Sequence, residues 1–254
     1  METVLEANKL SKTFSSGGIQ QHVLKNLDVE VYKGDFTVIM GASGSGKSTL
    51  LYALSGMDKP SLGDILYAGT QNIAKLSQDE LADFRKQNCG FIFQQIYLVD
   101  SMSILDNVLL SGLLKSKDKK AVLERAKNLL LSVGICETDF KKFPSQLSGG
   151  EAQRVAVIRA AINNPAVLFA DEPTGALNSQ NSTAVLDILT KLNKNGQSIV
   201  MVTHDIVSAV RANRILFLKD GRIEGELRLD KFTDESDERK NKVKVKGFLT
   251  NLGW

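Results

Sequence analysis

Short apolar runs alternate with stretches of helical periodicity along most of the chain. Runs at residues 36–40, 167–170 and 198–202 are almost entirely apolar, which is typical of strands buried on both faces. Apolar residues spaced three and four apart follow the first two runs and predict helices. Ser77 and Glu80 have the spacing of a capping box and predict one more helix start. Buried strands separated by helices predict an α/β domain with a parallel sheet.

The middle of the chain interrupts this alternation. After a strand-like run at residues 89–93, the pattern from Tyr97 to Gly134 is helical, with one apolar stripe and a glycine at its predicted end. We expect a helical subdomain at about residues 97–160, inserted into the α/β core. Residues 228–254 form a charged C-terminal extension, for which we predict an appended helix whose purpose the sequence does not indicate.

A glycine-rich loop directly follows the first buried strand. Residues 41–48 read Gly-Ala-Ser-Gly-Ser-Gly-Lys-Ser and match the pattern G-x-x-x-x-G-K-[ST], with a predicted helix immediately after it. Glycines let the backbone curl so that successive N–H groups point at phosphate oxygens, and the helix adds its positive end. We expect Lys47 to reach the β- and γ-phosphates of ATP and Ser48 to ligate Mg²⁺. A chance Gly/Ser-rich turn is the weaker interpretation, because strand, loop and helix occur together.

Two acidic residues follow the second buried strand. Asp171 and Glu172 are expected at the carboxyl edge of the parallel sheet, where such folds bind their ligands. We assign Asp171 to the metal and Glu172 to the attacking water, as general base. An Asp-Glu pair after a strand is by itself a common surface ending, so this assignment depends on the phosphate loop.

A second glycine-containing loop lies far along the sequence from the first. Residues 147–151, Leu-Ser-Gly-Gly-Glu, open a predicted helix that has no strand before it. The loop reads either as an ordinary helix cap or as a second anion site at the positive end of a helix. If it is an anion site, either one nucleotide bridges the two sites or two chains share nucleotides.

Composition indicates which partners and which cellular compartment to expect. The 32 basic and 29 acidic side chains leave a net charge of +3 without a long Lys/Arg run, so nucleic acid is not the expected partner. Cys89 and Cys136 lie in mainly apolar sequence without metal-ligand spacing, and we expect both to be reduced core residues of a cytosolic protein. We expect no signal peptide and no membrane span, so that another chain must supply the membrane if the protein works at one.

Taken together, these motifs resemble those of the nucleotide-binding subunit of an ABC transporter. The resemblance covers nearly the whole chain and rests on motifs that occur in the family's order. It implies a nucleotide-binding domain at residues 1–227, with a P-loop NTPase core and an N-terminal antiparallel β subdomain beside the inserted helices. It also implies a head-to-tail dimer, in which Ser148, Gly149 and Gly150 of one chain contact the γ-phosphate held by Lys47 of a second copy.

The family's other site residues carry over by motif. Gln94 is similar to the glutamine of the Q-loop, with Gln95 as the alternative if the register slips, and residues 147–151 resemble the signature motif. His204 is similar to the switch histidine, for which a core or capping histidine is the ordinary alternative. Phe14 matches an aromatic residue that the family places against adenine, although a strand-end Phe is more often core.

The resemblance therefore implies three sets of site residues for ATP and Mg²⁺. Catalysis is assigned to Glu172 and His204, and metal ligation to Ser48, Gln94 and Asp171. The predicted nucleotide contacts are Phe14, Gly41, Ala42, Ser43, Gly44, Ser45, Gly46, Lys47, Ser48, Thr49, Gln94, Ser148, Gly149 and Gly150.

Residues 41–48, 84–94 and 171–177 are similar to the branch of macrolide-export, lipoprotein-release and cell-division transporters, and most of all to bacterial peptide-antibiotic transporters of the bacitracin type. This implies a peripheral subunit on the cytoplasmic face of the bacterial plasma membrane, which drives a permease with a large extracytoplasmic domain. The expected task is export of, or resistance to, antimicrobial peptides or lipid-linked substrates. Lipoprotein release, cell division and nutrient import are alternatives, and a soluble ATPase acting on ribosomes or DNA is a remote one.

The chain departs from the family's pattern at one position of the loop that follows Glu172. The family usually has Asp where this chain has Asn178, which keeps an acceptor but loses the charge. We expect dimerisation to survive this change, and the sequence leaves open its effect on turnover.

Overall fold

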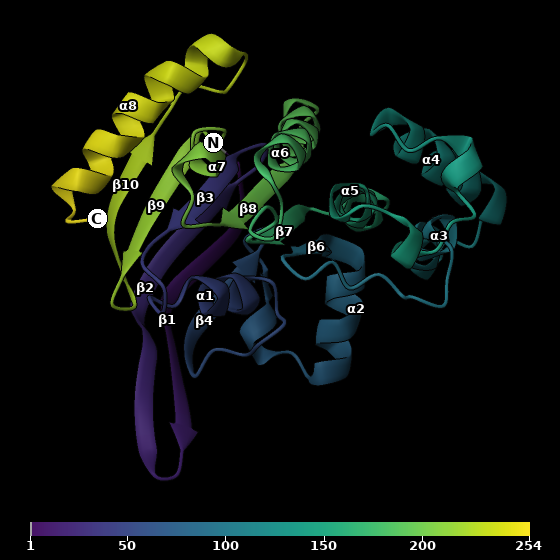
Figure 1. Cartoon of the computed structure of the whole chain (residues 1–254). Coiled ribbons are helices and arrows are strands. Elements are labelled where there is room, and N and C mark those ends of the chain that lie inside the picture. Colours follow the sequence, from purple (N-terminus) through teal and green to yellow (C-terminus); the bar gives the residue numbers. More distant parts are fainter. Residues whose placement is uncertain (1) are drawn as a thin grey trace.

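The computed structural model describes residues 2–254, and its central element is a six-stranded sheet with helices on both faces (Figure 1). Neighbouring strands from β9 to β6 run parallel, and β10 pairs antiparallel with β9 at one edge. In spatial order the strands are β10 (Arg222–Arg228), β9 (Arg214–Lys219), β3 (Phe36–Met40), β8 (Ser198–Val202), β7 (Val167–Asp171) and β6 (Cys89–Phe93). The predicted parallel sheet is confirmed, with one antiparallel edge strand added.

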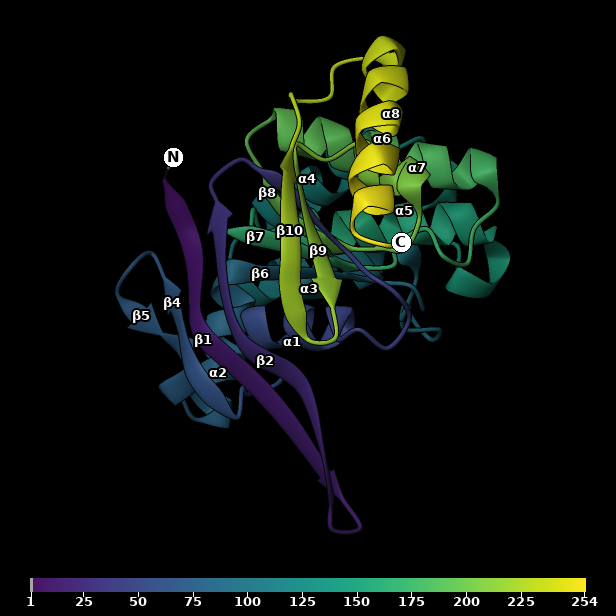
Figure 2. The ribbon, with the colours of Figure 1, turned by 90° about the vertical axis from the view of Figure 1, so that its left-hand side faces the viewer.

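A second, antiparallel sheet is formed mainly by the N-terminal part of the chain. Its strands lie in the order β2-β1-β4-β5, and β1 and β2 make a long hairpin that extends beyond the rest of the molecule (Figure 2). The strands are β1 (Thr3–Ser16), β2 (Ile19–Tyr32), β4 (Leu62–Tyr67) and β5 (Gln71–Asn72). The antiparallel β subdomain that the resemblance implied is confirmed.

Helices fill the connections between the strands. They are α1 (Lys47–Leu54), α2 (Gln78–Asn88), α3 (Ile104–Lys115), α4 (Lys119–Ser132), α5 (Gly149–Ala161), α6 (Ser179–Lys194), α7 (Ile206–Ala209) and α8 (Glu235–Asn251), with short 3-10 turns at Ile73–Lys75, Glu137–Asp139 and Pro144–Gln146. The capping box at Ser77 and Glu80 is present and opens α2 as predicted. Among the residues described, none of these helices combines the length and the hydropathy needed to cross a bilayer.

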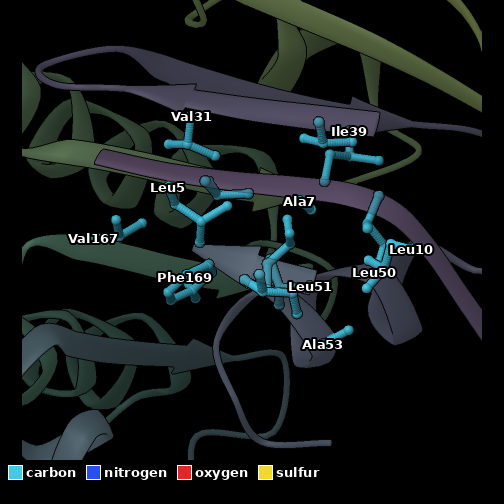
Figure 3. Close-up of a cluster of buried hydrophobic side chains, with 14 of the residues drawn as sticks. Leu5, Ala7, Leu10, Val31, Ile39, Leu50, Leu51, Ala53, Val167 and Phe169 are labelled. Atoms are coloured by element: carbon cyan, nitrogen blue, oxygen red, sulfur yellow. The ribbon is translucent and has the colours of Figure 1, made fainter. Parts of the chain in front are cut away.

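Alternate residues of the buried strands face opposite sides of the sheet, which gives two apolar layers. Ile39 and Phe169 pack toward α1 and the antiparallel sheet (Figure 3), whereas Met40 and Ala170 pack toward α5, α6 and α8. Full burial of a side chain as large as Ile39, Met40 or Phe169 contributes about 1.5–3 kcal/mol relative to exposure. The two layers hold the carboxyl ends of β3, β7 and β8 in fixed positions.

The helical region has its own apolar cluster but begins later than predicted. Side chains of α3, α4 and α5 pack together around Val108, Leu130 and Ile158. The expectation of helix from Tyr97 onward is wrong, because Tyr97 has φ 49° and Ser103 caps the first turn of α3. Gly134, with φ 76°, ends α4 as predicted.

The two cysteines have different environments. Cys89 is partly buried beside Tyr67, and burial raises the pKa of its thiol to about 12. Cys136 is exposed at the start of the turn after α4, so the expectation that it is a core residue is wrong. Its neighbour Ile135 is buried instead, in the apolar cluster of α3, α4 and α5. Cys136 then begins the 3-10 turn at Glu137–Asp139.

The charged extension forms the predicted helix, α8, which lies along β10 and the end of β9 (Figures 1 and 2). Val245 and Leu249 are buried in the apolar layer that also covers α6. A Cβ atom at Gly225 of β10 would lie 2.9 Å from Leu252 and 3.1 Å from Phe248, so a side chain there would force these two residues of the tail to shift.

Two glycine substitutions test this packing. Gly225→Val should lower the free energy of unfolding by about 1–3 kcal/mol, since the added side chain overpacks the contact with α8. Gly247→Ala is the matched change on α8 itself, where an added Cβ atom would have no neighbour within 4 Å. This substitution should raise the free energy of unfolding by up to about 1 kcal/mol, because alanine has the higher helix propensity. Denaturant unfolding measures both, and equal stability of Gly225→Val and the parent chain would contradict the packing described.

Candidate functional site

The phosphate loop, residues 41–48, connects β3 to α1 and has the conformation that its glycines permit. Gly44 and Gly46 have φ values of 80° and 102°, in the left-handed region that favours glycine. A Cβ atom at Gly41 would lie 2.1 Å from the carbonyl oxygen of Leu218 in β9, so only glycine fits there. The predicted strand, loop and helix are therefore all present.

The Lys47 ammonium group is held by the phosphate loop itself. It donates hydrogen bonds to the carbonyl oxygens of Gly41 and Ala42, at 2.8 and 2.9 Å. Burial lowers the pKa of Lys47, and the nearby carboxylates of Glu172 and Asp171 oppose that shift. The Lys47 ammonium group is thus partly removed from water and held within the phosphate loop.

Asp171 ends β7 and is fixed through both of its carboxylate oxygens. The Ser48 hydroxyl donates to Oδ1 at 2.9 Å, and the Tyr52 hydroxyl donates to Oδ2 at 2.6 Å. Burial, followed by the bond to Asp171, raises the pKa of Tyr52, so this phenol stays a donor. No role was predicted for Tyr52, although its spacing of four from Ser48 on α1 places both on one helix face.

These residues fit the Mg²⁺ ion that the sequence implies. Ser48 and Asp171 bring a hydroxyl and a carboxylate together, and Mg²⁺ is usually held by one or two carboxylates together with phosphates and water. Gln94 would add an amide oxygen from the neighbouring strand end. Phe93 pairs in register with Asp171, so Gln94 leaves β6 where Glu172 leaves β7.

Glu172 turns sharply off the end of β7 toward His204. Its φ of 45° is rare for a residue other than glycine, and its N–H donates to the carbonyl oxygen of Val202 at 3.0 Å. Glu172 Oε1 and His204 Nδ1 lie 2.9 Å apart. The two predicted catalytic side chains are thereby brought together.

The alternatives left open for His204 are not supported by its position. Its side chain is 67% exposed, so it is not a core histidine. Asp205, not His204, caps α7 by accepting from the N–H of Val207. The Glu172 side chain is only 17% exposed, so the acid of this pair is the more protected partner.

Gln94 lies against the segment that follows Glu172. Its Nε2 would be 3.0 Å from a Cβ atom at Gly175, so the side chain of Gln94 reaches this segment, in agreement with the choice of Gln94 over Gln95. Buried Gln153 of α5 joins the same two segments, since its Nε2 donates to the carbonyl oxygens of Phe93 and Pro173 at 3.0 and 2.8 Å. The position of Gln153, two residues after the Leu-Ser-Gly-Gly-Glu loop, is the sequence feature that could have indicated this link.

The Ser-Gly-Gly loop, residues 148–150, begins α5 at some distance from the phosphate loop. Ser148 and Glu151 form a reciprocal capping box, so the helix-cap interpretation is confirmed. Hydrogen bonds from Ser148 hold the pKa of Glu151 below its usual value. A Cβ atom at Gly150 would lie 2.3 Å from the side chain of Asn181, and Asn178 caps α6 next to it. The role of this loop as an anion site stays a prediction.

Phe14 lies on the extended hairpin of β1 and β2. Its ring is 44% exposed, which contradicts the alternative that it is a core residue. The Lys12 ammonium group lies 4.9 Å from the ring centroid. Phe14 is available for a flat apolar ligand, and its contact with adenine stays a prediction.

A cavity of about 710 Å³ lies over the phosphate loop. Lys47, Glu172 and His204 face it, and so does the buried Ser45, whose hydroxyl has no hydrogen-bond partner among the residues described. Other lining residues are Ala42, Ser43, Gly44, Phe217, Lys219, Asp220, Gly253 and Trp254. A buried hydroxyl without a partner and a desolvated ammonium group suit an anion, and the carboxylate beside them suits proton abstraction from water.

Comparisons with known proteins identify relatives of this chain. A sequence model described as "ABC transporter" matches residues 24–175. The chain is 44% identical over 221 residues to the bacitracin export ATP-binding protein BceA of Halalkalibacterium halodurans, covering 87% of each chain. It is 41% identical over 222 residues to the macrolide export ATP-binding/permease protein MacB of Pasteurella multocida, covering 87% of this chain but only 34% of that protein.

A solved structure shows the same fold. It is described as the dimeric post-hydrolysis state of the ATP-binding cassette MJ0796 bound to ADP and Pi, and it superimposes with a TM-score of 0.82 at 38% identity. The match covers 90% of this chain and 100% of that one. The family resemblance inferred from the motifs is thereby confirmed, and so is the predicted fold class. The chain belongs to the ABC transporter family, as one of its ATP-binding and ATP-hydrolysing cassettes.

Proposed function

We propose that this chain hydrolyses ATP between two of its copies in order to drive conformational change in a separate membrane permease. The observation that carries the proposal is the cavity in which Lys47, Glu172 and His204 face one space above the phosphate loop. Membership of the family indicates ATP hydrolysis, and the cavity brings together side chains that can bind phosphate and activate water.

In the proposed reaction, residues 41–49 hold the phosphates through backbone N–H groups and Lys47. Ser48, Asp171 and Gln94 would hold Mg²⁺, which neutralises phosphate charge when it is bound. Glu172 accepts a proton from the water that attacks the γ-phosphate. His204, 2.9 Å from that carboxylate, fixes its orientation toward the cavity.

The site is completed by a second copy in this proposal. Ser148, Gly149 and Gly150 are not among the described residues that line the cavity over the phosphate loop. Their glycines leave N–H groups at the start of α5, where the helix dipole favours an anion. A solved relative with 38% identity is described as a dimer bound to ADP and Pi, which supports the head-to-tail arrangement.

The permease and its cargo are proposed from the relatives. BceA is named for bacitracin export, and MacB joins ATP-binding and permease functions under one name, of which this chain spans 34%. We assign residues 1–227 to the nucleotide-binding domain and the helices within 97–160 to permease docking. The chain would lie on the cytoplasmic face of a bacterial plasma membrane, with a permease that has a large extracytoplasmic domain. Antimicrobial peptides or lipid-linked molecules are the proposed substrates.

Removal of the proposed base tests the chemistry. Glu172→Gln should lower the ATPase rate by about 100-fold or more, since a general base typically contributes that much. The affinity for a fluorescent ATP analogue should stay unchanged, and an ATP-bound dimer should accumulate on size-exclusion chromatography. Glu137→Gln, at an exposed acid far from the cavity, is the matched control. Normal turnover by Glu172→Gln would place the base elsewhere.

A mixture of two inactive variants tests the head-to-tail dimer. Lys47→Ala damages the phosphate loop of its own chain, and Ser148→Arg damages the site of the partner. Each should lack ATPase activity alone, whereas a mixed dimer has one site with both parts intact and should regain activity. A mixture that stays as inactive as its components, with mixed dimers shown by differential tags, would mean that each chain builds its own site.

Co-purification tests the permease assignment. The chain extracted from membranes should be recovered with a permease, and replacing residues 97–134 by those of a related cassette should abolish that recovery while ATP binding persists. Replacing residues 228–254 in the same way should leave the permease bound. Recovery with ribosomes or DNA instead would contradict the transport function.

A further inference from the structure

The cavity over the phosphate loop is lined on one side by the loop, Glu172 and His204, and it has a second wall made of residues outside the sequence motifs. This wall comes from the end of β9, the turn after it and the end of the tail, and consists of Phe217, Lys219, Asp220, Gly253 and Trp254. The sequence motifs account for the first wall only. Gly253 and Trp254 of this wall belong to the C-terminal extension, whose purpose the sequence does not indicate.

The tail is built to reach this position. Leu249 anchors α8 in the apolar layer of the core, and the N–H of Trp254 donates to the carbonyl oxygen of Leu249 at 3.0 Å. Gly253 has φ 75°, which reverses the chain direction after the helix. The indole then packs edge-on against Phe217, with ring centroids 5.7 Å apart and planes at 76°. Trp254 is 42% exposed and lines the cavity.

Lys219 adds an uncommitted positive charge to this wall. A Cβ atom at Gly253 would lie 3.8 Å from its Nζ, so the tail passes directly beside the ammonium group. Within residues 2–254, no hydrogen bond or ion pair engages the Lys219 side chain, whereas Lys47 bonds to the loop and Glu172 to His204. Asp220 also lines the wall, and the remaining charged groups that face the cavity are those already described.

We propose that Lys219 and Trp254 are further nucleotide-binding residues, which contact the polyphosphate of ATP in the cavity that they share with Lys47. The proposal rests on the function proposed above for the phosphate loop. Glu172 and His204 line the same cavity, which makes it the γ-phosphate end of the site, whereas Phe14 is not among its lining residues. Lys219 attracts the anion, and the indole excludes water from it, which strengthens the charge interactions inside.

Binding measurements on the full chain test the role of Lys219. Lys219→Gln should weaken ATP binding about fivefold, as expected for an exposed charge pair, with a smaller effect on ADP and none on AMP. Titrations by equilibrium dialysis without Mg²⁺ avoid hydrolysis. Lys219→Arg should restore the affinity, and Lys246→Gln, an exposed lysine on α8, is the matched control.

Trp254 is the only tryptophan of the chain, so its fluorescence reports on this wall alone. ATP should change the intensity or the emission maximum more than ADP does, and AMP should have no effect. Lys47→Ala should abolish the change, because it removes the phosphates from the cavity. Trp254→Phe should raise the Kd for ATP less than Trp254→Ala does.

The outcomes separate this inference from the proposed function. If the parent chain binds ATP with Lys47-dependent affinity but shows no fluorescence change, and Lys219→Gln binds ATP normally, the second wall does not contact the nucleotide. An equal loss of ATP and AMP affinity in Lys219→Gln would also overturn the proposal, since it would indicate a general structural effect. If the parent chain does not bind ATP at all, the proposed function itself fails.

Discussion

The hydrogen bond between Ser48 and Asp171 joins the two strand ends on which the whole site depends. It connects the phosphate loop, which follows β3, to the acidic end of β7, and these residues lie 123 positions apart in sequence. The strand between them, β8, pairs with both and ends at Val202, two residues before His204. Parallel pairing therefore brings residues from distant segments to one edge, where ligands of such sheets bind. Tyr52 occupies the second oxygen of Asp171 and leaves that carboxylate little freedom.

Much of this arrangement could be predicted because it depends on local sequence. A strand buried on both faces is almost uniformly apolar, so 198–202 was predicted with its observed bounds and 167–170 one residue short. The phosphate loop could be found because only glycines permit its backbone. The comparisons confirm the family and the fold class that the motifs predicted. The roles of the individual site residues are proposals.

The errors and omissions have a common physical origin in tertiary contacts. Cys136 has apolar neighbours in sequence, yet the turn after α4 leaves it exposed. Apolar spacing before Ser103 resembles a helix, but the side chain of Asn107 accepts from Val99 at 2.7 Å and holds that segment as a loop. Tyr52 belongs to no motif, and Gln153 follows the Leu-Ser-Gly-Gly-Glu loop without an assigned partner. The partners of both side chains lie far away in sequence and meet them only at the assembled sheet edge.

The β1–β2 hairpin has a consequence for solubility. Beyond Ser11, β1 no longer pairs with β4, and beyond Thr13, whose backbone bonds to the Ser61 hydroxyl, the outer part of the hairpin has two open backbone edges. Such edges can recruit strands from other molecules and start aggregation. Two features oppose this here, namely register shifts around Lys12 that twist the ribbon and a polar run at Gln20, Gln21 and His22. The hairpin can therefore expose Phe14 at its outer part without its strand edges promoting aggregation.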